Sequence, residues 1–297
     1  MRRCTRRFAL SRPLVSVVVP SYNQGRFLDE ALRSVLEQDY EPLEVIVVDG
    51  GSSDESVDVI RRHADRVAWW TSEADRGQAD ALNKGLGRAR GEILGWLASD
   101  DALLPGAVAR VVAELERTDA LLVYGEALFV DEEGREIHAL APRPFDVDAM
   151  VRACANHVVQ PGSLFRRRAW EEAGPLNVEG HYLFDFEFAL AVGRLGTVAR
   201  IPDRLSLYRV HPESKSGGGS LLKARDYVRF ADEYLARSGL DGADAGRGSA
   251  YLAAGDYFYD AGHLGDARRY LTRSLRLRPT RRGAALLARA VARSVVP

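Results

Sequence analysis

The chain has 297 residues, of which 46% are hydrophobic and 28% are charged, a balance typical of a globular protein that buries a sizeable core. No apolar run reaches the about 18 residues of a membrane-spanning helix, and the N-terminus lacks the apolar segment of a secretory signal. Cys4 and Cys154 are too few for a disulfide framework or a cysteine-rich zinc site, so we expect a cytoplasmic protein.

The formal net charge of −1 conceals an uneven distribution of charge. Residues 1–13 contain five arginines and residues 267–297 contain nine, with no acid in either segment. Residues 14–266 hold 27 basic against 42 acidic residues, a net charge of about −15. This strongly negative charge of residues 14–266 argues against nucleic acid binding. The basic ends favour an anionic partner, such as the inner face of the plasma membrane.

Strands alternate with helices over the first 125 residues. β-branched and apolar runs predict strands at 15–19, 44–48, 67–71, 93–97 and 121–124. Between them, apolar spacing predicts helices over 27–36 and 79–90, a capping box at 52–55 predicts a helix that continues to 62, and Pro105 predicts the first turn of another. Strands joined by helices of crossover length indicate an α/β fold with a mainly parallel sheet covered on both faces.

From about residue 125 the pattern changes. Residues 129–134 read as a strand that enters a turn, and the segment up to 210 mixes short strands with helices. The run SGGGS at 216–220 is typical of a flexible linker, and only helices are predicted after it. The predicted organisation is a basic extension (1–13), an α/β domain (14–215) with halves 14–125 and 126–215, a linker (216–221) and a helical tail (222–297).

Polar residues follow three of the predicted strands, at 20–23, 49–51 and 99–101. An aspartate at the end of a strand is most often a turn former or a helix cap. Three such clusters at the carboxyl edge of one parallel sheet instead indicate a ligand site. Adjacent Asp100 and Asp101 repel each other unless a cation or a sugar hydroxyl takes up their charge, and oxygen ligands suit Mg²⁺ or Mn²⁺.

Five segments resemble family 2 glycosyltransferases of the GT-A fold, in the same order and spacing. They are SVVVPSYN (16–23), VVDGGSSD (47–54), RGQADALNKG (76–85), WLASDD (96–101) and YRVHPES (208–214). The resemblance covers about residues 14–215. It implies a GT-A-type, Rossmann-like domain whose first half binds a nucleotide-diphosphate sugar, with a UDP-sugar favoured, and whose second half binds a saccharide or lipid-linked acceptor. The implied enzyme transfers the sugar with inversion in polysaccharide or glycoconjugate biosynthesis.

The resemblance also implies roles for residues of the donor site. Pro20 and Tyr22 would line the nucleobase pocket, Asp49 would accept the N3–H of uracil, and Asp100 would bind the ribose. The other donor-binding positions carried over from the family's segments are Arg76, Gln78, Asn83, Lys84, Ser99 and Arg209.

A divalent cation, Mn²⁺ or Mg²⁺, is implied by the same resemblance. Asp101 would bind it where it bridges the diphosphate, and His211 would be a second ligand, although an isolated histidine is most often structural. Many relatives have an acid at the position of Ser99. The chain departs from the family pattern at this point of the metal site.

The acceptor side is marked by QPGS (160–163) and LFDFEF (183–188). By resemblance Gln160 faces the acceptor and Asp185 is the general base. The alternative is that Asp185 and Glu187 are solvated helix acids, but aromatic residues at 182, 184, 186 and 188 create an apolar setting that raises a carboxyl pKa. On a helix the two acids point in opposite directions. Glu187 is then a candidate acceptor contact or the partner of an arginine.

The tail has two patterns of its own. One tetratricopeptide-like repeat is indicated by Tyr251, Ala254, Gly255, Phe258, Gly262, Ala267, Leu271, Ser274 and Pro279. A single repeat cannot bury its own face, so it is expected to pack on the catalytic domain or on the following helix. In that last helix Leu287, Val291 and Val295 form a stripe opposite Arg289 and Arg293, which indicates either membrane binding or packing with solvated arginines.

A second class of function is compatible with the tail. A degenerate transferase domain could serve as a non-catalytic adaptor that captures a partner through residues 222–297. The presence of Asp49, Asp100, Asp101 and Asp185 together argues for the enzyme.

Overall fold

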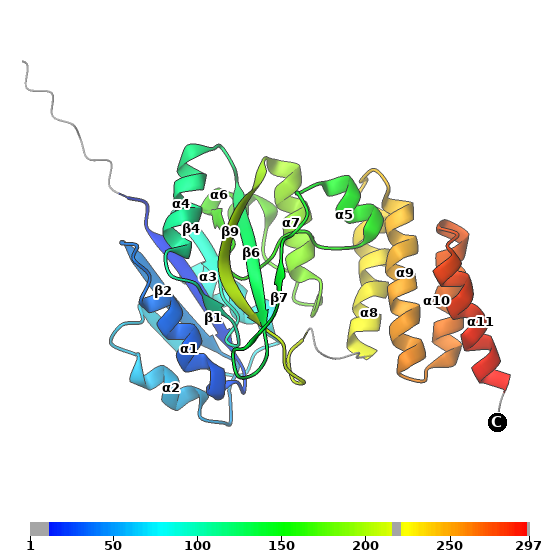
Figure 1. Ribbon diagram of the computed structural model, residues 1–297, viewed down its shortest axis with the longest axis horizontal. Helices are drawn as coiled ribbons and strands as arrows, with labels where there is room; N and C mark the ends of the chain where they lie inside the picture. The colour runs from blue at the N-terminus through cyan, green and yellow to red at the C-terminus, as the bar shows by residue number, and fades with distance from the viewer. Residues whose placement is uncertain (1–11, 216–220, 296–297) are drawn as a thin grey trace, which may run out of the picture.

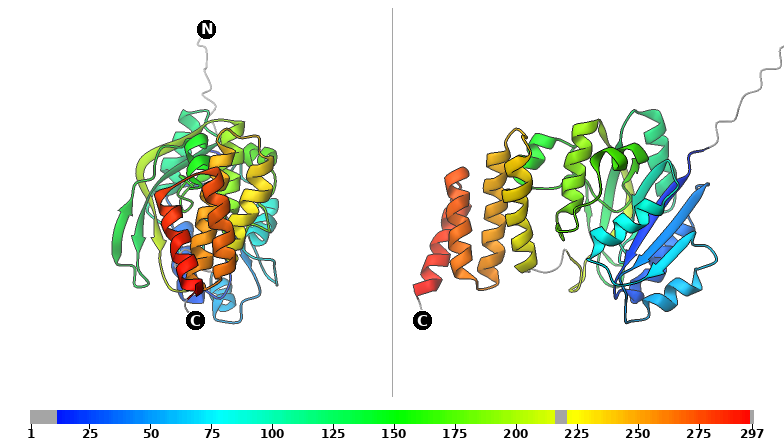
Figure 2. Two further views of the ribbon diagram at one scale, coloured as in Figure 1. Left: turned by 90° about the vertical axis from the view of Figure 1, so that its right-hand side faces the viewer. Right: turned by 180° about the vertical axis from the view of Figure 1, so that it is seen from behind.

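A computed structural model describes residues 12–215 and 221–295 of the chain (Figure 1). An α/β body lies at one end, and a stack of helices extends from its side, as the view from behind also shows (Figure 2, right). Most of the predicted basic extension and of the predicted linker lies outside the described residues.

The first half of the body is a parallel sheet. Its strands lie in the order β3-β2-β1-β4, with bounds β1 Val15–Ser21, β2 Leu43–Asp49, β3 Trp69–Ser72 and β4 Ile93–Trp96. The connecting helices are α1 Gly25–Leu36, α2 Ser56–Arg62 and α3 Gln78–Arg88. All seven residues of β1 are buried, as expected for a central strand with helices on both faces.

The second half extends the same sheet with mixed strand directions. Its elements are β5 Ala102–Leu103, α4 Ala107–Arg117, β6 Leu122–Val130, β7 Glu136–Leu140, α5 Val147–Ala153, β8 Leu164–Arg166, α6 Arg167–Ala173, α7 Phe184–Leu195 and β9 Val198–Arg209. β8 runs antiparallel to β4 and β6, whereas β6 runs parallel to β9. The predicted α/β fold is confirmed, with a sheet that is parallel up to β4 and mixed beyond it.

Two apolar cores lie on opposite faces of the sheet. On one face α1, α2 and α4 pack through residues such as Leu32, Ile60 and Val111. On the other, α3, α6 and α7 pack through residues such as Leu82 and Phe188. The three-layer arrangement leaves the carboxyl ends of the parallel strands as the open edge of the sheet.

Three predicted boundaries are corrected by the structure. The helix predicted from residue 52 begins at Ser56, because the Asp54 carboxylate accepts hydrogen bonds from the N–H groups of Gly25 and Ser56 and ties the preceding loop to α1. Pro105 precedes the N-cap residue of α4, Gly106, and so lies outside the helix. The strands predicted at 121–124 and from residue 129 are parts of one continuous strand, β6, which ends at Val130 before the predicted turn.

The tail consists of helices and helical turns in its described part. They are α8 Leu221–Arg229, a π-turn Phe230–Tyr234, a 3₁₀ turn Leu235–Arg237, α9 Ala243–Asp260, α10 Leu264–Leu277 and α11 Arg281–Val295. α9 and α10 form a hairpin whose turn contains Gly262 at φ +79°. The helices approach closely at Gly255, where a Cβ would lie 2.6 Å from Leu271 Cγ.

A third core joins the tail to the body. Met150, Leu183 and Phe186 of the body pack with residues of α8, the π-turn and α9, including Phe230 and Tyr251. The tail therefore shares a buried interior with the second half of the body.

The last helix packs on the hairpin by a different face from the predicted stripe. Leu286 and Ala290 are buried, and Leu287 is partly buried against the same core, whereas Val291 is 45% exposed. Leu287 and Val291 of the predicted stripe thus do not form one free apolar face, and the side chain of Val295 lies outside the described part of the chain. In the part of the chain that the structure describes, no helix is both long and apolar enough to cross a membrane.

Candidate active site

The three predicted polar clusters meet at the carboxyl edge of the sheet. Ser21 pairs with Asp49 at the ends of β1 and β2, and the Gly50 N–H donates to the Ser21 carbonyl at 2.8 Å. Gln24, which follows β1, accepts a hydrogen bond from the Ser99 hydroxyl at 2.8 Å and lies 3.5 Å from Asp100 Oδ2. The loops after β1, β2 and β4 therefore form one polar region.

Asp49 organises the loop after β2. Its carboxylate is fully buried and accepts hydrogen bonds from the N–H groups of Gly51 and Ser52 at 3.1 and 2.9 Å, and from the hydroxyls of Ser52 and Ser72 at 2.6 and 2.7 Å. Pro20 lies next to it within β1, paired with Val48. Four donors thus occupy the two oxygens of Asp49 and hold the loop after β2 in place. A direct contact between Asp49 and uracil stays a prediction.

Tyr22, Gly50 and Asp75 pack closely beside this loop. The Tyr22 ring is 64% exposed, and a Cβ on Gly50 would lie 3.2 Å from Tyr22 Cδ2 and 3.0 Å from Asp75 Oδ2. Because Gly50 has no side chain, the ring and the carboxylate can both approach its backbone this closely. Asp75 is half-buried, burial raises its pKa, and its Oδ1 accepts the Gly77 N–H at 2.7 Å. The sequence analysis missed Asp75, although it directly precedes the RGQ segment.

The RGQ segment lies at the start of α3. Gln78 is the first residue of this helix, and the exposed Arg76 guanidinium lies 3.4 Å from Asp80. Lys84 pairs with Glu73 at 3.1 Å. Asn83 has both ends of its amide bonded to the backbone of Leu176, at 2.9 Å each, so in this structure Asn83 joins α3 to the loop before α7.

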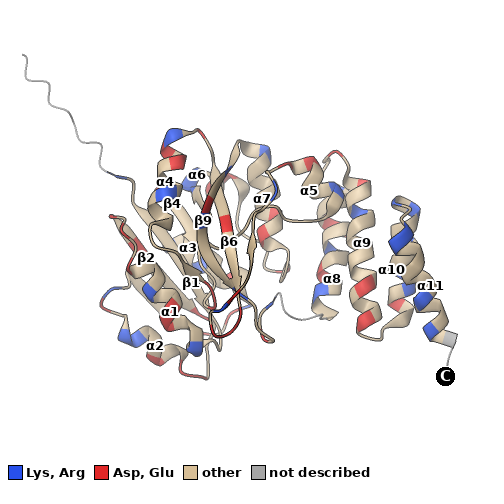
Figure 3. Ribbon diagram, viewed as in Figure 1, with Lys and Arg blue, Asp and Glu red and all other residues tan. Residues whose placement is uncertain are grey.

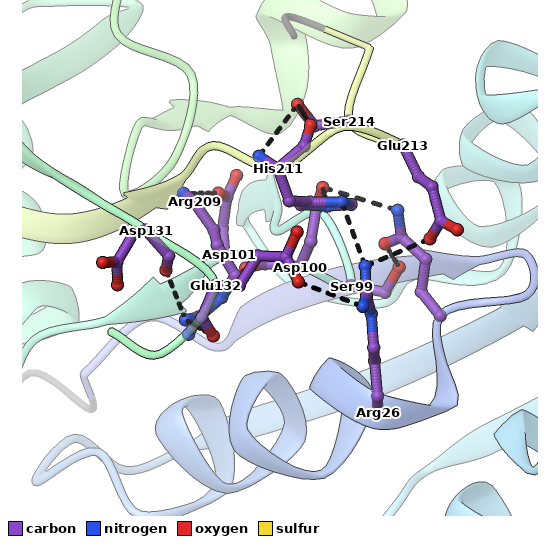
Figure 4. A network of polar contacts seen from close by, with 11 residues as sticks. Arg26, Ser99, Asp100, Asp101, Asp131, Glu132, Arg209, His211, Glu213 and Ser214 are labelled. Carbon is purple, nitrogen blue, oxygen red and sulfur yellow. Dashed lines mark hydrogen bonds and ion pairs between the residues drawn. The ribbon is translucent and has the colours of Figure 1, made fainter. Parts of the chain in front are cut away.

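Asp100 and His211 face each other across the site (Figure 4). His211 Nε2 lies 3.2 Å from Asp100 Oδ2, and its Nδ1 lies 3.4 Å from Nη2 of Arg26. Arg26, at the start of α1, also pairs with Glu132 at 3.2 Å and with Glu213 at 3.1 Å. The segment after β9 is thus held against the loop after β4, and Arg26 is a residue that the sequence analysis missed.

Asp101 and Arg209 form a buried layer behind this pair. The Arg209 N–H donates to Asp101 Oδ1 at 2.9 Å, and its guanidinium donates to Glu30 at 2.7 Å and to the carbonyls of Asp100, Asp131 and Glu132. Arg209 is 3% exposed, which favours a role in holding these loops together. Burial, and then the charge of Asp100, raise the pKa of Asp101.

Asp100 and His211 are the candidate ligands for a divalent cation. Among the residues described, no three His, Cys, Asp or Glu side chains are arranged as a complete metal-binding group. Asp100 and His211 nevertheless provide an oxygen and a nitrogen 3.2 Å apart, with the Asp101 carboxyl crowded behind them. Mg²⁺ and Mn²⁺ sites of phosphate-binding enzymes use one or two carboxylates and take further ligands from the phosphates and water. The geometry favours Asp100, rather than Asp101, as the partner of His211.

Asp185 lies in the first turn of α7, as predicted. Its Oδ1 accepts the Phe186 N–H at 2.8 Å, and its Oδ2 accepts a hydrogen bond from the Asn156 amide at 3.2 Å. Burial raises its pKa, with Asn156 and Lys215 opposing this shift. A carboxylate in a mostly apolar setting, held by one backbone N–H and one side-chain amide, is a candidate general base.

Three further residues each have a partner within the protein. Gln160 donates its amide to the Trp96 carbonyl at 2.7 Å, which places the QPGS loop against the end of β4. Glu187, 7% exposed, pairs with Arg229 of α8, so it points toward an arginine, and its role as an acceptor contact stays a prediction. Lys215 donates to the His181 carbonyl at 2.9 Å, and desolvation lowers its pKa to about 8.

Sequence comparison assigns the chain to a family. The model of glycosyl transferase family 2 matches residues 16–174, more than half of the chain, and the chain belongs to this family.

Named relatives agree with this assignment. A glycosyltransferase of Nostoc sp. is 27% identical over 208 residues, which cover 66% of this chain and 65% of that protein. One of Haemophilus influenzae is 28% identical, covering 69% and 68%. One of Rickettsia felis is 34% identical over 44% of this chain, but the match spans only 22% of that protein. The chain thus spans less than two thirds of the Nostoc and Rickettsia proteins.

Solved structures show the same fold. S. aureus TarS 1–349 superposes with a TM-score of 0.66 at 16% identity, over 94% of this chain and 87% of that one. The mannosyltransferase PcManGT of Pyrobaculum calidifontis, solved with GDP-Man and Mn²⁺, superposes with a TM-score of 0.60 at 23% identity, over 96% and 81%. The α/β body with its C-terminal helices is a GT-A fold.

Proposed function

We propose that the protein is an inverting, metal-dependent glycosyltransferase that uses a nucleotide-diphosphate sugar. The observation that carries the proposal is Asp185, which lies in an apolar setting on α7, while the candidate donor and cation residues lie at the carboxyl edge of the sheet. TarS has been solved with UDP and with UDP-GlcNAc, and PcManGT with GDP-Man. These neighbours support a nucleotide-sugar donor here.

The proposed chemistry assigns each side of the site a task. Tyr22, Gly50 and Asp75 would bind the nucleobase, and the loop fixed by Asp49 would shape this pocket. Asp185 would take the proton from an acceptor hydroxyl as that oxygen forms a bond to the anomeric carbon. The bond to the diphosphate breaks at the opposite face of the sugar, which inverts the configuration.

The charge that grows on the departing diphosphate needs cationic partners. Asp100 and His211, backed by Asp101, would hold Mn²⁺ or Mg²⁺, and a cation bound there would supply charge neutralisation. Arg26 contacts His211 from the side of α1 and adds positive charge close to the same place. Lys215, whose pKa is lowered to about 8, lies on the side of Asp185.

The test of this proposal is release of a nucleotide diphosphate. The protein is incubated with Mn²⁺ and a panel of UDP, GDP and dTDP sugars, with and without saccharide or lipid-linked acceptors, after a thermal-shift screen for the bound nucleotide. We expect one nucleotide, UDP by resemblance, to raise the melting temperature and its sugar to be turned over with an inverted product. Stable binding of protein partners by residues 222–297, with no turnover of any donor, would instead support the adaptor.

The tail is proposed to bring the enzyme to an anionic membrane surface, where a lipid-linked acceptor of polysaccharide or glycoconjugate biosynthesis would be met. Basic residues gather on α10 and α11 (Figure 3). Six arginines there are exposed and form no ion pair with any residue that the structure describes: Arg268, Arg269, Arg276, Arg281, Arg289 and Arg293. Because the apolar stripe is partly used in packing, the attraction would be mainly electrostatic.

Neutralising this face should release the protein from anionic vesicles. Each basic residue near such a surface contributes about 1 kcal/mol, so a triple variant Arg268→Gln, Arg276→Gln, Arg289→Gln should bind roughly 10²-fold more weakly in vesicle pelleting. The control neutralises Arg61, Arg62 and Arg88 on the α/β body. Equal pelleting of wild type, variant and control, or binding that does not weaken with salt, would contradict membrane attraction.

A further inference from the structure

The first helix of the tail reaches the helix that carries Asp185. Asp226 of α8 is 4% exposed, and its Oδ2 accepts hydrogen bonds from the backbone N–H groups of Tyr182 at 2.7 Å and Leu183 at 2.9 Å. These two residues directly precede α7. N–H groups at the start of a helix have no acceptor within the helix, so a carboxylate from another segment that accepts them fixes where the helix begins.

Arg229 lies one turn further along α8 and links Asp226 to a side chain of α7. Its Nε donates to Asp226 Oδ1 at 3.0 Å, and its Nη2 donates to Glu187 Oε1. Glu187 also accepts a hydrogen bond from the Asn177 amide at 3.0 Å. A Cβ on Gly180 would lie 2.8 Å from Arg229 Nη2, so glycine at this position leaves room for the guanidinium. The pair is largely buried, and separating it would leave a charge without a partner.

An aromatic contact lies beside the ion pairs. The Phe230 ring, which is fully buried, lies 5.1 Å from the Phe186 ring, and Phe186 is the residue whose N–H donates to Asp185. The Tyr234 hydroxyl donates to the Glu187 carbonyl at 3.4 Å. The tail thus packs along residues 185–187 on the side that Glu187 faces.

The second support of Asp185 also depends on the tail. Asn156, whose amide donates to Asp185, follows α5 closely in the chain. α5 lies against α9: the Ser249 hydroxyl donates to the Arg152 carbonyl at 2.7 Å, and a Cβ on Gly246 would lie 2.5 Å from the Val151 carbonyl oxygen. Both neighbours of the Asp185 carboxylate are therefore fixed by segments that pack on residues 221–258.

We infer that the helical tail positions the general base, with Asp226 and Arg229 as positioning residues that hold the first turn of α7 against α8. The inference rests on the proposed role of Asp185. Neither residue lies among the candidate donor or cation groups, so both act through α7. The tail is then part of the catalytic apparatus, in addition to any contact that α10 and α11 make with a membrane.

The test compares full-length variants for kcat, for the KM of the nucleotide sugar and for nucleotide affinity. A misplacement of about 1 Å at a reacting group costs about 10²-fold, and we expect a loss of this order in kcat for Arg229→Met and a smaller loss for Asp226→Asn. The KM and the nucleotide affinity should stay within about twofold of wild type, because the hydrogen bonds and ion pairs of Asp226 and Arg229 in the described structure are with α7, the residues just before it and each other. Arg229→Lys should restore part of kcat.

The matched control is Asp256→Asn, which removes an ion pair with Arg282 between α9 and α11 and leaves α7 untouched. Asp185→Asn is measured alongside: full activity in that variant would refute the proposed function itself. If Asp185→Asn is inactive while Arg229→Met and Asp226→Asn bind nucleotide and keep wild-type kcat, the positioning role is wrong. If Arg229→Met fails to fold, wild-type kcat in both Asp226→Asn and Arg229→Lys overturns it equally.

Discussion

The Asp185→Asn variant is expected to lose about 10²- to 10⁴-fold in kcat, the usual contribution of a general base, with unchanged affinity for the nucleotide diphosphate. An amide has the shape of the carboxyl but cannot take the acceptor proton. The measurement is steady-state kinetics at saturating donor and acceptor, together with nucleotide titration. Glu187→Gln, on the same helix, is the comparison: its amide oxygen can still accept a hydrogen bond from Arg229, so its loss in kcat should be clearly smaller than that of Asp185→Asn. A reversed order of the two effects would make Glu187 the base.

The pH dependence of wild-type kcat gives an independent readout of the same group. Burial raises the pKa of Asp185, whereas the Lys215 amine opposes this, and the phenol of Tyr227 on α8 also faces it. The base must be ionised, so kcat should fall about tenfold per pH unit below this pKa. The acid limb should lie above the value of about 3.9 for a solvated aspartate. An acid limb at that ordinary value would contradict the buried setting.

As pH rises through the pKa of Asp185, the free energy of unfolding should fall while kcat rises. A carboxyl whose pKa is raised in the folded state binds more protons folded than unfolded between its two pKa values, so stability falls as pH rises through that window. At neutral pH the ionised, buried Asp185 carboxylate lowers the stability of the wild type by the full amount, whereas Asp185→Asn has no such charge. The variant should therefore melt at the same temperature as wild type at pH 7 or higher than it, and a clear drop in the melting temperature would indicate that Asp185 is mainly structural.

Loss of the cation site is expected to have the second large effect. In the wild type, Mn²⁺ should strengthen binding of UDP or GDP, measured by calorimetry without any turnover. Mutation of residues that only support a metal's ligands weakens metal binding by about 10- to 100-fold. Asp100→Asn and His211→Ala change the proposed ligands themselves, so each should weaken the Mn²⁺-dependent part of nucleotide binding by more than this. The reason is that an amide or a methyl group replaces one of two donors that lie 3.2 Å apart.

Two further variants make this test specific. Glu132→Gln is the acidic control, because its carboxylate pairs with Arg26 rather than with the donor set. Asp101→Asn separates the two aspartates: binding that remains Mn²⁺-dependent would place Asp101 behind the site, as its contact with the Arg209 N–H indicates. Nucleotide affinity that is identical in EDTA and in Mn²⁺ for the wild type would remove the cation from the mechanism.

The sequence predicted the elements of the site better than their contacts. The strands that end at this edge follow from local β-branched runs, and the place of Asp185 in the first turn of α7 follows from the unbroken apolar run after it and from family position. The hydrogen bonds of Asp49 and the bonding of Asn83 to Leu176 depend on loops that meet only in the folded chain. A sequence motif identifies such a residue, but it does not show which of its polar atoms are already hydrogen-bonded within the folded protein.

Contacts between distant segments were the least predictable. Arg229 and Glu187 are 42 positions apart, and the sequence indicated only that Glu187 would face away from Asp185, toward an arginine that it could not identify. The apolar stripe of α11 was misassigned for a related reason. Helical spacing shows that a helix is amphipathic, whereas the neighbouring helix decides which of two adjacent rows, Leu286 and Ala290 or Leu287 and Val291, is buried.

The core that joins α5, α7, α8 and α9 bears on how this chain can be re-engineered. When a targeting segment is joined to an enzyme only by a flexible linker, it can be exchanged for that of a homologue with little loss of stability. Here a cut near residue 220 would divide one packed interior, so a chimaera that keeps Met150 and Phe186 from one parent needs Phe230 and Tyr251 from the same parent. A crossover after α9 would divide the same interior, because Tyr270 and Leu271 of α10 and Leu286 of α11 belong to it. The basic surface is therefore better altered by substituting its exposed arginines than by exchanging α10 and α11.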